Sequence, residues 1–304
     1  MKVGIFYSSI TNISKAPHKG TLMDVFKAGV VANGDQIIEY RVPNAPIDPT
    51  LDAGFVLGYS IGDNYRRKII DTLKNNNAYR IFVDSNILNY ARPEHQWHRY
   101  SMNSVYPNDG IYFFDQLNKN KWTEFSKWHK VESLPWRNNG EHILVVCQRP
   151  KGWNMFAPNQ DDWLFDTLTK LHKYTQRPIR IRMHPGDGNK QLTIDKIAAT
   201  YGNSVTISTA SNIKEDLINC WCTVGYNSTP NAVGLIEGVP GYIEDPLHSW
   251  AKDIAFTDLS LIENPPMPDR SNWLTKIANI HWSNTEVSTG KLWSAIKTYI
   301  SSVR

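Results

Sequence analysis

The feature that most constrains the fold is an alternation of short apolar segments with segments of helical periodicity, which occurs in both halves of the chain. The predicted strands of the first half are residues 3–7, 36–42, 53–58 and 79–84, with helices at 20–31 and around 65–73. Short apolar strands separated by helices are typical of parallel sheets that are covered on both faces. We therefore predict an α/β fold with a doubly wound sheet in this half.

The same alternation resumes after residues 134–142, where Pro, Gly and Asn together indicate a linker. The predicted strands of the second half are 143–147, 178–183, 204–208 and 221–224, with helices at 162–174, 194–201, 273–280 and 289–303. The 304 residues suffice for two domains of ordinary size. We predict Rossmann-like domains at 1–135 and 141–275 with a cleft between them. A helical segment follows at 276–304, and its return to the first domain stays open.

Residues 223–243 read as a loop, a short helix, a glycine stop and a buried strand. Ser228 or Thr229 is suited to cap the helix, and Gly238 ends it. A helix start with free N–H groups and two hydroxyls is suited to phosphate binding. Glu237, near the far end, is a candidate acceptor of hydrogen bonds from ribose hydroxyls. The pattern indicates a nucleotide-diphosphate site. A capped surface helix with a solvated carboxylate is the alternative.

Further polar side chains follow the other strands of the second half. Gln148 and Arg149 come after one strand, and His184 after the next. Arg182 lies two residues before His184, so a period of two predicts that both point the same way. Because the carboxyl ends of parallel strands share one edge, these donors are expected to meet the hydroxyls there and bind phosphate oxygens. A purely structural role for the histidine is the alternative.

Several other site classes are disfavoured. No Gly-x-Gly-x-x-Gly follows the first strand, and no P-loop lysine is present, which disfavours dinucleotide oxidoreductases and P-loop enzymes. The three cysteines, Cys147, Cys220 and Cys222, lack the spacing of a zinc site and are expected to be buried thiols. We therefore expect no bound metal and no cofactor.

Two Rossmann-like halves with a nucleotide motif in the second resemble the GT-B glycosyltransferases. The stretches Arg182-Met-His-Pro185 and Asn227-Ser-Thr…Glu237-Gly-Val-Pro240 resemble the His-Pro and Ser/Thr motifs of bacterial capsule-type sugar transferases and polysialyltransferases. Residues 258–273 are similar to phage-encoded glycosyltransferases. The resemblance is clearest over residues 143–275. It implies that a nucleotide-diphosphate sugar is the co-substrate. In the family pattern His184, Ser228 and Thr229 hold its phosphates, Glu237 holds its ribose, and no metal is needed.

An inverting transfer needs a general base in the first half to deprotonate the acceptor hydroxyl. Asp84 is the first candidate because it ends an apolar strand, and Asp63 and Asp115 are the alternatives. Each of the three is also suited to a structural role as a helix cap or turn residue. Retention of configuration stays open, as do the sugar and the nucleotide.

Residues 85–135 interleave aromatic and basic side chains. We expect most of the aromatics to be structural. The candidate acceptor-binding residues in this segment are Arg92, His95, Trp97, Arg99 and Tyr100. Together with the net charge of +4 and the phage resemblance, they favour double-stranded DNA carrying 5-hydroxymethylpyrimidines, with the modified base flipped out of the duplex. The alternatives are a surface polysaccharide or lipid-linked glycan as the acceptor, and a non-catalytic nucleotide-sugar-binding protein.

The first residues enter a strand directly, without the pattern of a signal peptide, and no apolar run approaches the roughly 20 residues of a membrane span. We therefore expect a soluble cytoplasmic protein, in the host cytoplasm if it is phage-encoded. The sequence leaves its oligomeric state open.

Overall fold

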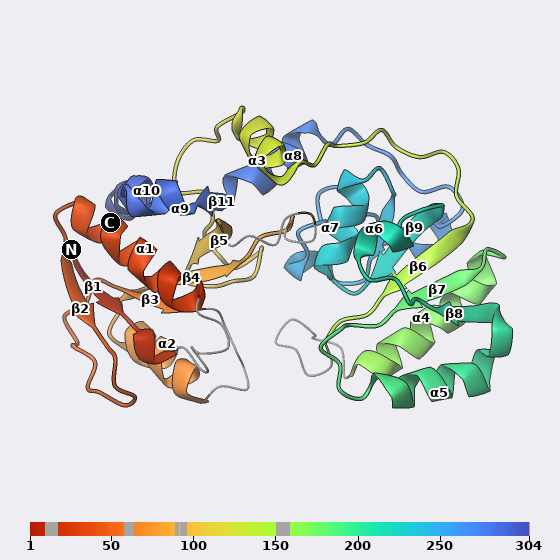
Figure 1. Ribbon diagram of the computed structural model, residues 1–304, viewed down its shortest axis with the longest axis horizontal. Coiled ribbons are helices and arrows are strands. Elements are labelled where there is room, and N and C mark those ends of the chain that lie inside the picture. The colour runs from red at the N-terminus through yellow and green to blue at the C-terminus, as the bar shows by residue number, and fades with distance from the viewer. Residues whose placement is uncertain (10–17, 58–63, 89–90, 92–95, 150–158, 304) are drawn as a thin grey trace. The chain divides into compact units, whose positions relative to one another are not determined.

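The computed structural model describes residues 1–304 except 10–17, 58–63, 89–90, 92–95, 150–158 and 304 (Figure 1). The chain divides into two compact units. Unit 1 consists of Met1–Asn89, Pro93–Phe125 and Leu274–Arg304, and nearly all of unit 2 is Ser126–Trp273. The main segment of unit 2 therefore begins at Ser126, whereas the predicted first domain extends to residue 135. The C-terminal segment from Leu274 belongs to unit 1.

Unit 1 is built on a six-stranded sheet with the order β11-β5-β4-β3-β1-β2. The strands are β1 (Lys2–Ile5), β2 (Gln36–Glu39), β3 (Ala53–Leu57), β4 (Tyr79–Ser85), β5 (Trp97–Met102) and β11 (His281–Ser283). The four strands from β2 to β4 are parallel, as the sequence predicted. Strands β5 and β11 were not predicted, and they extend the sheet in antiparallel pairing.

Helices cover both faces of this sheet. They are α1 (His18–Ala32), α2 (Asn64–Asn75), α9 (Asn284–Ser288) and α10 (Lys291–Val303), while α3 (Lys121–His129) and α8 (Ser271–Asn279) cross the unit boundaries. Phe55 of β3 stacks on Phe26 of α1 with ring centroids 4.0 Å apart. The preceding residue, Gly54, faces α2, where a Cβ atom would lie 2.5 Å from Leu73 Cδ1. Since neighbouring strand residues point to opposite faces, α1 and α2 lie on opposite sides of the sheet.

Unit 2 is built on a five-stranded, fully parallel sheet with the order β10-β9-β6-β7-β8. Its strands are β6 (His142–Val146), β7 (Ile179–Arg182), β8 (Val205–Ile207), β9 (Cys220–Gly225) and β10 (Gly241–Ile243). In chain order this is the 3-2-1-4-5 arrangement of a doubly wound Rossmann sheet. The predicted fold class, two Rossmann-like α/β domains, is therefore confirmed for each unit.

In β6, the central strand of unit 2, residues 143–146 are all apolar because both faces of the strand are covered. Ile143 and Val145 pack with α4 (Gln160–Tyr174), whereas Leu144 and Val146 pack with α6 (Ile213–Asp216) and α7 (Thr229–Ile236). Every residue of β6 is therefore buried, and no polar alternation arises. Helix α5 (Lys190–Tyr201) links β7 to β8. This arrangement aligns the carboxyl ends of β6, β7, β9 and β10 along one edge.

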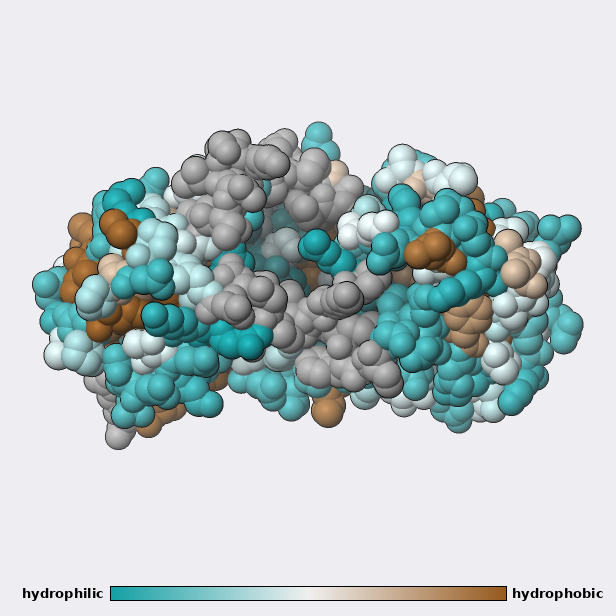
Figure 2. Space-filling view, turned by 90° about the horizontal axis from the view of Figure 1, so that it is seen from below, coloured by the Kyte–Doolittle hydropathy of each residue, from teal (hydrophilic) through white to brown (hydrophobic). Residues whose placement is uncertain are grey.

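Among the described residues on the face shown in Figure 2, hydrophilic ones predominate and hydrophobic ones gather in small groups. Among the helices of the described residues, none is long and apolar enough to cross a membrane.

Candidate functional site

In unit 2 a buried polar network lies where β6 and β9 are neighbours, which is the topological switch point of the sheet. Gln148, after β6, donates from Nε2 to Asn227 Oδ1, after β9. Asn227 in turn donates from Nδ2 to Asp245 Oδ2 at 3.0 Å, and His248 Nδ1 lies 2.8 Å from the same carboxylate oxygen. Gln148 and Asn227 are buried. The network therefore cross-links the chain that follows three strands, β6, β9 and β10.

His184 follows β7 at the same edge and is half-buried. The backbone N–H of Gly186 donates to its Nδ1 at 2.9 Å. Because Nδ1 accepts, the neutral ring carries its proton on Nε2. Burial lowers the pKa of His184, and the positive charge of Arg149 lowers it further. The result is a neutral imidazole at pH 7 that presents an Nε2–H donor, with the exposed Arg149 guanidinium nearby.

Ser228 and Thr229 open α7 beside this network. Ser228 occupies the N-cap position, yet its side chain makes no capping hydrogen bond to the described helix. Pro230 has no backbone N–H, and the N–H of Asn231 donates to the Ser228 carbonyl at 3.1 Å. This end of α7 therefore offers an anion the Ser228 hydroxyl, the N–H of Thr229 and the positive end of the helix dipole. His184, Arg149, Ser228 and Thr229 thus belong to three strand ends along one edge, as the sequence predicted.

Arg182 does not contribute to this edge. Its Nη1 lies 2.5 Å from Oδ2 of the buried Asp216 and also donates to the carbonyl of Ala210 at 3.2 Å. The expectation that it points with His184 is wrong, because the strand ends at Arg182 and its side chain lies on the face covered by α6. Its contacts are structural.

Glu237 is also separated from the other candidates. It is the C-cap of α7, so about eight residues of helix, or roughly 12 Å, lie between it and Ser228. Its side chain is 9% exposed and its Oε1 lies 3.1 Å from Lys214 Nζ. Helix α7 runs away from the carboxyl edge, so its end lies near the start of β10. The structure therefore supports neither a shared pocket with His184 nor a solvated carboxylate.

In unit 1 the corresponding edge contains a cavity of about 220 Å³. Asp84, at the end of β4, is in its wall. One carboxylate oxygen lies 2.6 Å from Arg99 Nη2, and the other accepts a hydrogen bond from the Ser85 backbone N–H at 2.8 Å. The Asp84 side chain is 32% exposed. The carboxylate is thus held in one orientation while it faces an open space.

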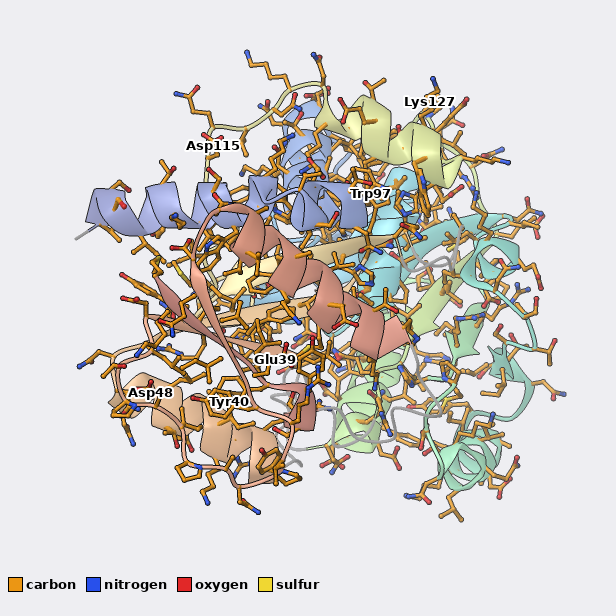
Figure 3. All side chains as sticks on the ribbon, turned by 60° about the vertical axis from the view of Figure 1, so that its left-hand side comes forward. Glu39, Tyr40, Asp48, Trp97, Asp115 and Lys127 are labelled. Carbon is orange, nitrogen blue, oxygen red and sulfur yellow. The ribbon has the colours of Figure 1, made fainter. Side chains whose placement is uncertain are left out.

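The candidate acceptor residues divide into three groups. Trp97, which is labelled in Figure 3, lines the cavity. Arg99 is buried and binds Asp84 and the Ser85 carbonyl, at 2.7 Å for the latter, and Tyr100 lies in the core against Phe26. The prediction that Tyr100 contacts the acceptor is therefore wrong. Arg99 pairs with Asp84, so its guanidinium is not placed to bind DNA phosphates. Arg92 and His95 lie outside the described residues.

Of the two alternative bases, the structure describes one. Asp63 lies outside the described residues. Asp115 is exposed and lines a separate cavity with Lys121 and Asn279, and Figure 3 shows it well apart from Trp97. Among the three carboxylates considered, Asp84 is the one that the described structure places at the carboxyl edge of the sheet.

Sequence reasoning missed Asp245 and His248 in unit 2, and Lys19, Arg66 and Asn86 around the cavity of unit 1. The first two directly follow β10, a signal that could have been used. Lys19 and Arg66 belong to the first turns of α1 and α2. These helices begin at the carboxyl edge of the sheet, where Asp84 also lies.

The three cysteines are buried free thiols whose pKa values are raised by burial. In the part of the chain that the structure describes, no group of three or more His, Cys, Asp or Glu side chains is arranged to hold a metal ion.

No family model and no curated protein sequence matches this chain. Solved structures do. A chain described as Thermosulfurimonas dismutans KpsC, beta Kdo 2,4 transferase, matches with a TM-score of 0.52 and 13% identity, covering 86% of this chain and 89% of that one. The beta Kdo 2,7 transferase of KpsC from the same organism matches with a TM-score of 0.50 and 10% identity over 98% and 99% of the two chains. Identities this low show a shared fold.

Proposed function

We propose that this protein is a glycosyltransferase that transfers a sugar from a nucleotide-sugar donor to a hydroxyl group of a polysaccharide or related glycan. The observation that carries the proposal is the group of donors at the carboxyl edge of unit 2. The Nε2–H of His184, the guanidinium of Arg149 and the uncapped hydroxyl of Ser228 at the start of α7 are suited to an anionic phosphate.

In the proposed reaction Asp84 accepts the proton of the acceptor hydroxyl as that oxygen attacks the anomeric carbon of the donor. The new glycosidic C–O bond forms while the bond from carbon to the phosphate oxygen breaks. The electron pair leaves with the nucleotide. Arg149, His184 and the N-terminus of α7 stabilise that developing negative charge. Arg99 orients the Asp84 carboxylate at 2.6 Å. A single displacement of this kind inverts the configuration.

A glycan acceptor is favoured over DNA by where the basic and aromatic residues lie. DNA binding requires exposed cations that contact phosphates. Of the residues that suggested DNA, Arg99 is paired in the interior and Tyr100 is fully buried. The two similar structures carry names of Kdo transferases, which supports a glycan as the acceptor here.

The test is a donor and acceptor panel with the full chain. Nucleotide-activated hexoses, uronic acids, sialic acid and Kdo are each incubated with oligosaccharides and, separately, with hydroxymethylated duplex DNA, and products are detected by mass spectrometry. We expect sugar transfer to a glycan with at least one donor. Transfer to DNA alone would replace the acceptor and keep the enzyme class. Binding of a nucleotide sugar without any turnover would favour the non-catalytic alternative.

The donor site is tested by calorimetry with the donor that the panel identifies. His184→Ala should weaken binding by about 1–3 kcal/mol through the loss of a hydrogen bond to a charged group. His172→Ala is the control, because His172 lies in α4, where its Nδ1 is 2.7 Å from the Leu168 carbonyl and its ring stacks on Tyr201. Equal affinities of the two variants would remove His184 from the site.

A further inference from the structure

The cavity of unit 1 has a charge pattern that the proposed reaction alone does not require. Asp84 is the acidic side chain among its described lining residues, and Arg99 balances its charge from within the protein. Lys19 and Arg66 also line the cavity. The described lining therefore carries more positive than negative charge.

Lys19 is the more informative of the two cations. It is half-buried in the first turn of α1 and forms no ion pair with any other residue in the described structure. A lysine ammonium at a cavity wall, with no countercharge from the described residues, is suited to pair with an anion that a ligand supplies. Arg66, by contrast, is positioned by its Nε–H, which donates to the Ser9 carbonyl at 2.8 Å.

Backbone dipoles add to this positive potential. Both α1 and α2 follow parallel strands and so begin at the carboxyl edge, and neither has an acidic residue in its first turn. Lys19 and Arg66 lie in those first turns, which places two helix N-termini at the cavity. The switch point of the parallel part of this sheet, between β1 and β3, is at the same edge.

The rest of the lining suits a sugar ring. Trp97, Leu22 and Val83 supply an apolar wall, and the Asn86 side chain is 5% exposed. Asn86 Nδ2 donates to the Trp97 carbonyl at 3.0 Å, while its Oδ1 accepts no hydrogen bond from any residue in the described ranges. At about 220 Å³ the cavity is below the usual range for drug-sized ligands, so it is suited to one sugar unit.

We propose that this cavity is an acceptor subsite for a sugar unit that carries an anionic group, a carboxylate or a phosphate, bound by Lys19, Arg66 and the starts of α1 and α2. The inference rests on the proposed function, since it places the acceptor hydroxyl beside Asp84 while the anionic group lies against the cations. It predicts that neutral glycans are poor acceptors.

The test uses an array of glycans that differ only in their terminal unit, which is a hexose, the matching uronic acid or the matching sugar phosphate. The full chain should retain acidic ends roughly tenfold better than neutral ones. Lys19→Gln should lose that preference. Lys27→Gln should keep it, because Lys27 is on the same helix but pairs with Glu39 at 2.6 Å. Preference for uronic acid or for phosphate identifies which anion is bound.

Equal retention of neutral and acidic ends, or an unchanged preference in Lys19→Gln, would overturn the subsite. So would Lys19-dependent retention of hydroxymethylated DNA with no preference among glycans. Nucleotide affinity, measured in parallel, separates the two proposals. Transfer to neutral glycans would leave the enzyme class intact and remove this subsite. Acid-selective binding without nucleotide binding would leave the subsite and remove the transferase.

Discussion

A close aspartate–arginine pair is found in each unit, and the two pairs differ in which partner is buried. In unit 1 the arginine is buried and the carboxylate is accessible: the Arg99 side chain is 8% exposed and that of Asp84 is 32% exposed, with 2.6 Å between them. In unit 2 the carboxylate is buried: Asp216 is 1% exposed, Arg182 is 19% exposed, and their atoms are 2.5 Å apart.

The difference separates a carboxylate that is open to a ligand from one that is enclosed within the protein. Asp84 accepts hydrogen bonds from Arg99 and from the Ser85 backbone N–H and also lines a cavity, so it is placed to accept a proton from a ligand. Asp216 accepts hydrogen bonds from Arg182 and Ser208 and contacts Arg180 at 4.0 Å, so its oxygens are occupied within the protein. Under the proposed function, the same pair of residue types serves chemistry in unit 1 and folding in unit 2.

The largest expected effect is on turnover. Asp84→Asn should lower kcat by roughly 10²- to 10⁴-fold, because the amide cannot accept the acceptor proton. Its effect on unfolding should be about 1 kcal/mol, since the pair is partly solvated and the amide oxygen still accepts a hydrogen bond. Donor affinity should be unchanged. Turnover and urea denaturation measure the two quantities. Asp115→Asn, at the separate cavity, is the control. If Asp84→Asn keeps its turnover, the role moves to Asp63 or Asp115.

The second expected effect is on stability, with the opposite signature. Asp216→Asn should lower the free energy of unfolding of unit 2 by about 3 kcal/mol, because it leaves Arg182 without its buried countercharge. The protein that remains folded should bind the donor normally. Asp166→Asn is the control. Asp166 pairs with Lys170 at the surface at 2.6 Å and should change stability by less than about 0.5 kcal/mol. Weakened donor binding at full stability would return Arg182 to the donor site.

The two sheets were largely predictable because their central strands are buried on both faces. The apolar run in β6 predicts a buried strand, and the periodic apolar residues of α4 predict a helix, so both elements can be recognised from the local sequence. Strand β5 was missed because its sequence, Trp-His-Arg-Tyr-Ser-Met, has no apolar run, although all six residues are buried. Its polar members are satisfied by tertiary partners such as Asp84 for Arg99, which the local sequence does not show.

The candidate site was predictable where a residue's role follows from its place at a strand end. His184 and Ser228 are examples, since chain order and parallel pairing place both at one edge. Arg182 and Arg99 were misassigned because a cation near a strand end can contact either a ligand or a buried carboxylate. The choice depends on α6 in one case and on the pairing of β4 with β5 in the other.

A smaller effect concerns His184 and pH. Burial and the charge of Arg149 lower the pKa of His184. The ring is therefore neutral at pH 7 and becomes charged only at a pH below the ordinary pKa of histidine. The folded state binds this proton less readily than the unfolded state, so protonation reduces stability in that range. An anionic donor favours the charged ring, so donor affinity should rise roughly fivefold between about pH 7 and pH 5.

That pH dependence should disappear in His184→Ala and persist in His172→Ala. Calorimetry should use an intact nucleotide sugar, which lacks the phosphate monoester that ionises near pH 6. A pH dependence that survives in His184→Ala would assign the titration to another group and leave His184 as a neutral donor at most.

The smallest expected effect tests a third ion pair, between Glu237 and Lys214. It resembles the pair of unit 2 described above, because the carboxylate is 9% exposed and the lysine is 46% exposed. Glu237→Gln should change donor affinity by less than about twofold, since Glu237 is at the opposite end of α7 from Ser228. A ribose-binding carboxylate would instead cost about 1–3 kcal/mol when it is neutralised. Calorimetry with the cognate donor distinguishes the two. A loss of tenfold or more would mean that the nucleotide extends along α7 to its C-terminal end, and that a buried carboxylate in this fold can serve binding as well as folding.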